Sequence, residues 1–80
     1  MIKYHKQTER FILSQGKTVA LQLYKAIEQL PLGDVKRLHG QKEPPLHRLR
    51  VGDFRIIFCM ENDSITILRI DNRGDVYKRT

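Results

Sequence analysis

The chain has 80 residues, of which 40% are apolar and 30% charged, and its 15 Lys and Arg against 9 Asp and Glu leave a net charge of +6. This length fits one domain with a thin core, residues 1–80, and the apolar content is too high for a disordered chain. The charge excess predicts a polyanionic partner, such as nucleic acid, the ribosome, a membrane surface or an acidic protein.

The sequence has features of a protein that works in a reducing compartment. Its single cysteine, Cys59, cannot form a disulfide within the chain, and the apolar neighbours predict a small buried side chain rather than a nucleophile. No apolar run approaches the ~20 residues of a membrane-spanning helix. The first residues also lack the apolar stretch of a secretion signal. We therefore expect a cytoplasmic protein.

Two helices are predicted in the first half of the chain, after a short strand over residues 2–5. The first helix covers about residues 8–15, and Thr8 can cap it. The second covers about residues 17–30, because apolar residues recur every three or four positions, and Pro31 stops it. This apolar stripe consists of Val19, Leu23, Ala26, Ile27 and Leu30.

Three strands joined by tight turns are predicted in the second half, after a basic loop over residues 32–45. The strands cover, in turn, residues 47–51, 54–60 and 64–70. Their short connections make them antiparallel. The element order is β-α-α-β-β-β, so we expect an α+β fold of two layers, with a helical hairpin on one face of an antiparallel sheet. In the last strand, Ile65, Ile67 and Arg69 are expected to share a face.

The face of the sheet opposite the helices is predicted to be rich in arginine. Alternation along residues 47–51 turns the apolar residues toward the helices and Arg48 and Arg50 away from them. Arg55 lies near these two across the hairpin. Arginine grips phosphate oxygens with a planar fork, and an aromatic ring such as Tyr77 can stack on a base. The pattern is typical of single-stranded RNA binding.

The same residues also have structural explanations. Arg48 and Arg50 can form the solvated side of a strand. Arg55 can pair with Asp53 or Glu61 on the surface, and the aromatic residue of the tail can belong to the core. The three histidines are dispersed, and the sequence has neither paired carboxylates nor a cluster of metal ligands. We therefore expect no metal and no cofactor.

Three segments resemble motifs of the RelE/ParE toxin superfamily, in the same order along the chain. Residues 47–58, HRLRVGDFRIIF, resemble the YRLRVGDYRVIY motif of these toxins. Residues 33–40, GDVKRLHG, are similar to their GDVKKLKG loop, and residues 70–78, IDNRGDVYK, to their closing HRRDVYK segment. The resemblance covers most of the chain and implies the same β-α-α-β-β-β fold.

The resemblance implies a toxin of a type II toxin–antitoxin system, with a cognate antitoxin protein as partner. RelE-like members enter the ribosomal A site and cut mRNA without a metal, so the ribosome and mRNA are expected partners. The 2′-OH attacks the adjacent phosphate and leaves a 2′,3′-cyclic phosphate and a 5′-OH, which requires proton transfer and positive charge at the phosphate. ParE-like members share the motif but poison DNA gyrase, and a family member can also have lost its activity.

Four residues match catalytic positions of RelE-like enzymes. Arg48 stands where these enzymes have a basic residue near the nucleophile, and Arg55 matches the arginine that stabilises the phosphate. Arg73 matches a C-terminal arginine that acts as acid or charge stabiliser, and Tyr77 matches a tyrosine that orients the substrate. The further RNA contacts that we expect are Lys36, Arg37, Arg50 and Lys78.

The sequence departs from the family pattern at two positions. Arg48 replaces the lysine that serves as base in the best-studied RelE-type sites, and a guanidinium hardly gives up its proton. Asn72 stands where a histidine is usual. His47 is adjacent to Arg48, but alternation points it to the other face. These residues therefore predict a strong phosphate-binding charge without an evident general base.

Overall fold

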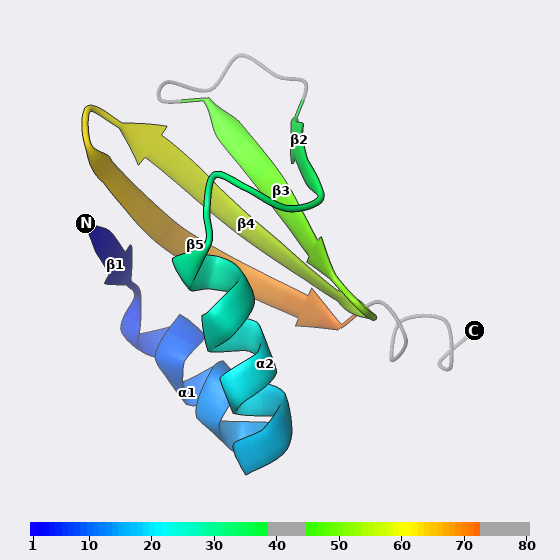
Figure 1. Cartoon of the computed structure of the whole chain (residues 1–80). Helices are drawn as coiled ribbons and strands as arrows, with labels where there is room; N and C mark the ends of the chain where they lie inside the picture. Colours follow the sequence, from blue (N-terminus) through cyan, green and yellow to red (C-terminus); the bar gives the residue numbers. More distant parts are fainter. Residues whose placement is uncertain (39–44, 73–80) are drawn as a thin grey trace.

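The structure is a computed structural model that describes residues 1–38 and 45–72 (Figure 1). Its elements are β1 (Ile2–Tyr4), α1 (Lys6–Ser14), α2 (Lys17–Glu28), β2 (Val35–Arg37), β3 (Leu46–Val51), β4 (Phe54–Glu61) and β5 (Ser64–Asn72). The strands form a five-stranded sheet in the order β1-β5-β4-β3-β2. β1 runs parallel to β5, and the other neighbours are antiparallel. The predicted α+β fold of two layers is confirmed.

The two helices form a hairpin that covers one face of the sheet (Figure 1). Gly16 lies between them with a φ of 93°, a conformation that glycine adopts at little cost, so the chain reverses direction within a few residues. The apolar stripe of α2 points inward, and Leu23 and Ile27 are fully buried. Neither helix is long and apolar enough to cross a membrane, and the same holds for all of residues 1–38 and 45–72.

The core lies between the helical hairpin and the sheet. Phe58 is fully buried in β4, where alternation turns it and Ile56 toward the helices. Edge-to-face ring pairs extend this packing at the sides, with Tyr4 against Tyr24 at 5.6 Å between ring centroids and Phe11 against Phe54 at 6.0 Å. The buried residues of the core are Ile12, Ala20, Leu23, Ile27, Leu30, Leu49, Ile56, Phe58, Ile67 and Ile70.

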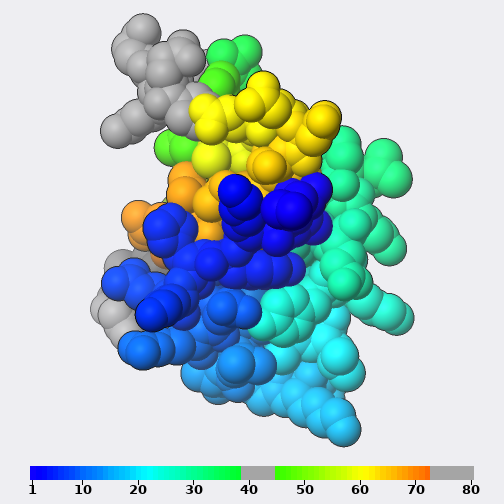
Figure 2. All heavy atoms as spheres, turned by 90° about the vertical axis from the view of Figure 1, so that its left-hand side faces the viewer, coloured from blue at the N-terminus to red at the C-terminus, as the bar shows by residue number. Residues whose placement is uncertain are grey.

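The sheet is built from two hairpins and one parallel pairing. Gly52 and Asn62, both with positive φ, form the turns of the β3–β4 and β4–β5 hairpins that the sequence predicts. β1 then lies along the outer edge of β5, where Ile2 pairs with Ile65. Figure 2 shows this edge of the molecule, with the dark blue N-terminal residues against the orange and yellow residues of the last two strands.

The structure differs from the predicted elements at the start of α1 and in the segment between α2 and β3. α1 begins at Lys6, not at Thr8, and its N-cap residue is His5. Thr8 does not cap the helix, because it is buried and its hydroxyl bonds to carbonyls of β5. The predicted loop over residues 32–45 contains β2, which adds a strand to the expected order. Val35 is the reason, since it pairs with Leu49 and packs against the core.

A β-bulge in β5 overturns the predicted alternation of that strand. Ile57 pairs with Arg69 and Phe58 pairs with Ile67, so β5 has one extra residue, Leu68, between two consecutive positions of β4. Beyond Leu68 the two faces of the strand exchange. Ile70 lies in the core with Ile67, and the expectation that Arg69 shares the face of Ile67 is wrong.

Candidate functional site

The face of the sheet opposite the helices, called the open face below, carries a row of cationic residues. The strand register places Arg50 directly opposite Arg55, and it places Arg48 between Lys36 on one side and Ile57 on the other. The central part of the open face includes Lys36 from β2, Arg48 and Arg50 from β3, Arg55 and Ile57 from β4, and Arg69 and Asp71 from β5. Asp71 is the single acidic side chain among these residues.

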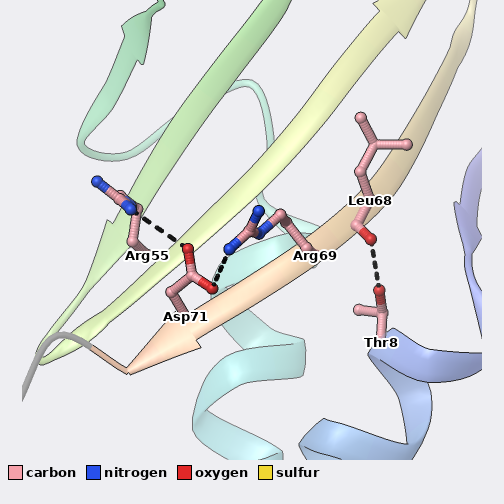
Figure 3. A network of polar contacts seen from close by, with 5 residues as sticks. All are labelled: Thr8, Arg55, Leu68, Arg69 and Asp71. Atoms are coloured by element: carbon pink, nitrogen blue, oxygen red, sulfur yellow. Dashed lines mark hydrogen bonds and ion pairs between the residues drawn. The ribbon is translucent and has the colours of Figure 1, made fainter. Parts of the chain in front are cut away.

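Two arginines of the open face converge on one carboxylate (Figure 3). Arg69 Nη2 lies 2.9 Å from Asp71 Oδ1, and Arg55 Nη2 lies 3.3 Å from Asp71 Oδ2. Burial of Asp71 raises its pKa, but the hydrogen bonds and charges of Arg69 and Arg55 together outweigh this effect, so the pKa is lowered. Asp71 is therefore ionised at neutral pH and holds both guanidinium groups in place.

Arg48 is more enclosed than the other ion-paired arginines. Its side chain is 18% exposed, and its Nη2 lies 3.8 Å from Asp34 Oδ1 at the end of the loop before β2. Asp34 is 63% exposed, so this ion pair contributes little to stability. The sequence suggested Asp53 or Glu61 as possible surface partners of Arg55, but Arg55 pairs with Asp71 across the β4–β5 ladder.

A shallow cavity of about 300 Å³ lies on the open face. Three apolar side chains, called its apolar floor below, line it together with the two paired arginines and their carboxylate. The lining residues are Leu38, Leu46, Arg55, Ile57, Arg69 and Asp71. Arg55 Nε is buried there and donates to no acceptor within the described residues. An apolar floor beside bidentate donors suits a flat ligand that carries an anionic group, such as a nucleotide.

The structure brings together most of the predicted site residues that it describes. Lys36, Arg48, Arg50 and Arg55 all lie on the open face. Arg37 pairs with His47, and alternation places both on the helix-covered side of the sheet. Three further predicted residues, Arg73, Tyr77 and Lys78, lie outside the described residues.

His47 and Cys59 illustrate the two faces of the sheet. The His47 ring stacks on Phe58, with 5.5 Å between ring centroids, so it points away from the arginines as its position in the strand predicts. Within the described residues the open face has no imidazole. Cys59 pairs with Leu46 on the open face and is half-buried, whereas the sequence predicts a buried side chain.

Sequence reasoning missed Arg69 and Asp71 as members of the site. Without the bulge at Leu68, strict alternation from Ile67 puts Arg69 on the helix-covered face and leaves no reason to connect it with Arg55. The spacing of Arg69 and Asp71, two residues apart on one strand, indicates that they share a face. That signal was available in the sequence, although it does not reveal which face they share.

The chain matches known proteins over most of its length. Residues 2–77 match the family model of the ParE toxin of type II toxin–antitoxin systems, parDE. A search of curated proteins found no match. Among solved structures, the chain is similar to the archaeal RelE–RelB complex from Pyrococcus horikoshii OT3, with 30% identity, a TM-score of 0.70, and coverage of 91% of this chain and 93% of that one.

A second solved structure shares the fold at lower sequence identity. It is the RelB–RelE antitoxin–toxin complex from Methanococcus jannaschii, with 21% identity and a TM-score of 0.62. The alignment covers 96% of each chain. The helical hairpin and sheet described above are thus the architecture of both neighbours.

Proposed function

Because the chain belongs to the RelE/ParE superfamily of type II toxin–antitoxin toxins, we propose that it is a ribosome-dependent endoribonuclease that binds mRNA on its open face. The observation that carries this proposal is the convergence of Arg55 and Arg69 on the Asp71 carboxylate. Two guanidinium groups that share one carboxylate are spaced to share the oxygens of one phosphate. The neighbouring apolar floor of Leu46 and Ile57 offers a surface for the attached nucleoside.

The proposed reaction is attack of a ribose 2′-oxygen on the adjacent phosphorus. The O2′–P bond forms as the P–O5′ bond breaks, the 2′-OH loses its proton, and the 5′-oxygen gains one. The transition state concentrates negative charge on the phosphate oxygens, which Arg55 and Arg69 face, while Arg48 supplies charge near the nucleophile. Arg73 and Tyr77 are proposed to act on the leaving oxygen and the base.

Charge and positioning carry most of the proposed catalysis. Arg48 remains protonated at neutral pH, and the lowered pKa of Asp71 makes that carboxylate a poor proton acceptor. The described open face therefore contributes by binding and orienting the phosphate. We propose that the ribosomal A site supplies further alignment of the mRNA, which makes cutting depend on the ribosome and places the protein in the cytoplasm.

We also propose a cognate antitoxin as the partner that covers the protein when it is inactive. The Pyrococcus horikoshii neighbour was solved as a complex with RelB. This chain exposes Leu13, Leu21 and Leu32, at 66%, 56% and 71%, along the helices and the segment after them. An antitoxin with apolar anchors for this surface and acidic groups for the open face would complete a thin core and neutralise the arginines.

The direct test is cleavage of mRNA on translating ribosomes in a purified system. We expect cuts within the A-site codon that leave 2′,3′-cyclic phosphate ends. Arg55→Gln should lower the cleavage rate about 100-fold or more, as loss of one group that stabilises a transition-state charge does in other enzymes. Arg37→Gln removes the same charge from the helix-covered side and is the matched control, for which we expect nearly full activity.

The matching family model is that of ParE toxins, so inhibition of DNA gyrase is the second candidate function. A supercoiling assay with purified gyrase, run beside the cleavage assay, separates the two. Intact mRNA together with inhibited gyrase would replace the nuclease proposal by the gyrase one. Absence of both effects from the folded chain would indicate a family member that has lost its activity.

A further inference from the structure

The bulge at Leu68 decides which face of the sheet receives Arg69. Pairing of Ile67 with Phe58 in a regular ladder would place the next residues of β5 opposite Ile57 and Ile56, so Arg69 would face the core. The observed pairing places Arg69 opposite Ile57 instead. One inserted residue therefore moves a guanidinium from the helix-covered face to the open face, where it meets Asp71.

The bulge has a specific partner in the first turn of α1. Thr8 is 2% exposed, and its Oγ1 lies 3.2 Å from the carbonyl oxygen of Leu68 (Figure 3). The carbonyl oxygen of Ile67 lies 3.5 Å from the same hydroxyl. The Ile67 carbonyl also accepts the backbone N–H of His5, which follows β1. A bulge leaves one residue out of the strand pairing, so its carbonyl needs a partner from another element.

The position of Thr8 follows from the parallel pairing of β1 with β5. This pairing ends with Tyr4 opposite Ile67, one residue before the bulge. The chain then turns into α1, and the Thr8 hydroxyl continues along the edge of β5 where β1 stops. A cavity of about 190 Å³ lies beside this point, lined in part by Thr8, Leu68 and Arg69. The side chains around Thr8 therefore do not fill this place completely.

We propose that Thr8 is a positioning residue for the open face: its hydroxyl holds the Leu68 carbonyl in the bulge and so sets Arg69 against Asp71. The hydroxyl of Thr8 bonds to the backbone carbonyls of Ile67 and Leu68 and not to a side chain of the open face. Its effect reaches Arg69 through the β5 backbone, in which Arg69 directly follows Leu68. The consequence for RNA rests on the function proposed above, whereas the positioning of Arg69 is a property of the protein alone.

The test compares Thr8→Val, which keeps the shape and removes the hydroxyl, with Thr8→Ser, which keeps the hydroxyl. The readout is the titration of the Asp71 carboxyl by NMR, because Arg69 lowers its pKa only when the guanidinium lies beside it. We expect Thr8→Val to raise this pKa toward its ordinary value and Thr8→Ser to leave it unchanged. A loss of overall stability does not move the titration of the molecules that remain folded.

Arg69→Gln supplies the second arm of a double-mutant cycle. It raises the pKa of Asp71 directly, and adding Thr8→Val to it should cause little further change, because the group that Thr8 positions is gone. If Thr8→Val alone leaves the Asp71 titration unchanged, or if the two changes add fully, Thr8 does not position Arg69. If Thr8→Val folds only in part, trimethylamine oxide raises the folded fraction, whose signals still report Asp71.

RNA binding separates this inference from the proposed function. A single-stranded RNA of about ten nucleotides should bind Thr8→Val about tenfold more weakly than Thr8→Ser, the cost of one charge-assisted contact. An altered Asp71 titration with unchanged RNA binding would keep the positioning role of Thr8 and refute RNA binding at this part of the open face.

Discussion

The two faces of the sheet use the same strands for opposite purposes. The helix-covered face buries Ile56, Phe58 and Ile67 completely, whereas the open face leaves Arg55 43% and Arg69 68% exposed. Neighbouring residues on one strand therefore serve stability on one face and, in the function proposed above, binding on the other. This separation allows a chain of 80 residues to carry a cluster of like charges without placing any of it in the core.

Ile56 and Ile57 offer the largest expected effect and the sharpest comparison, because they are adjacent, identical and on opposite faces. Ile56 is 0% exposed in the core and Ile57 is 9% exposed under the arginines. Ile56→Ala should lower the free energy of unfolding by about 4 kcal/mol and Ile57→Ala by about 2 kcal/mol. Urea unfolding followed by circular dichroism measures both, and equal losses would contradict the division between the faces.

Arg69→Gln should affect binding and leave stability nearly unchanged. The exposed ion pair with Asp71 contributes about 0.5 kcal/mol or less to folding. Loss of a phosphate contact should weaken single-stranded RNA binding about tenfold and reduce the slope of log affinity against log salt by about one. Fluorescence anisotropy at several salt concentrations tests this, with Arg37→Gln as the control of equal charge on the other face.

Asp71→Asn should strengthen RNA binding, because the Asp71 carboxylate competes with the RNA phosphate for the guanidinium groups of Arg55 and Arg69. A carboxylate about 4 Å from a phosphate oxygen repels it by ~1 kcal/mol even in water. Removal of the carboxylate charge should therefore raise the affinity for RNA about fivefold. The same titration with labelled RNA measures it. Weaker binding by the folded variant would mean that Asp71 serves the open face mainly by ordering Arg55 and Arg69.

The smallest expected effect is on the acid dependence of stability. The pKa of Asp71 is lower in the folded protein than in the unfolded chain, so its contribution to stability is present above the unfolded value and is lost as the pH falls through the folded value. Asp71→Asn should therefore lose less stability between pH 6 and pH 3 than the unchanged protein. Urea unfolding at several pH values within this range would reveal the difference, and parallel curves would exclude a role for Asp71.

The sequence predicts the parts of this molecule that depend on near neighbours. Alternation around the turn at Gly52 is enough to place Arg48, Arg50 and Arg55 on one face, and the register confirms the arrangement. The apolar stripe of α2 is likewise visible in the sequence. In both cases the signal lies within a few residues of the feature.

The missed features depend on contacts between distant segments. The Leu68 bulge is tied to the hydroxyl of Thr8, 60 residues away, and the site role of Arg69 depends on that bulge. β2 was missed because Val35 is its single apolar residue and gains its partner only from β3. The local sequence pattern predicts neither feature, because a bulge and a short edge strand are stabilised by contacts with segments that are distant in the sequence.

Because β1 pairs with β5, the fold cannot be completed until the ribosome has synthesised β5. A ribosome makes the chain from its N-terminus, so β1 and α1 emerge well before β5, the last described element and the one on which they dock. Until β5 has emerged, the nascent chain lacks Arg69, the bulge that places Arg69 on the open face, and Asp71, which pairs with Arg55. The arginine cluster is therefore completed late, and we expect a polypeptide that terminates before β5 to be harmless to the cell that makes it.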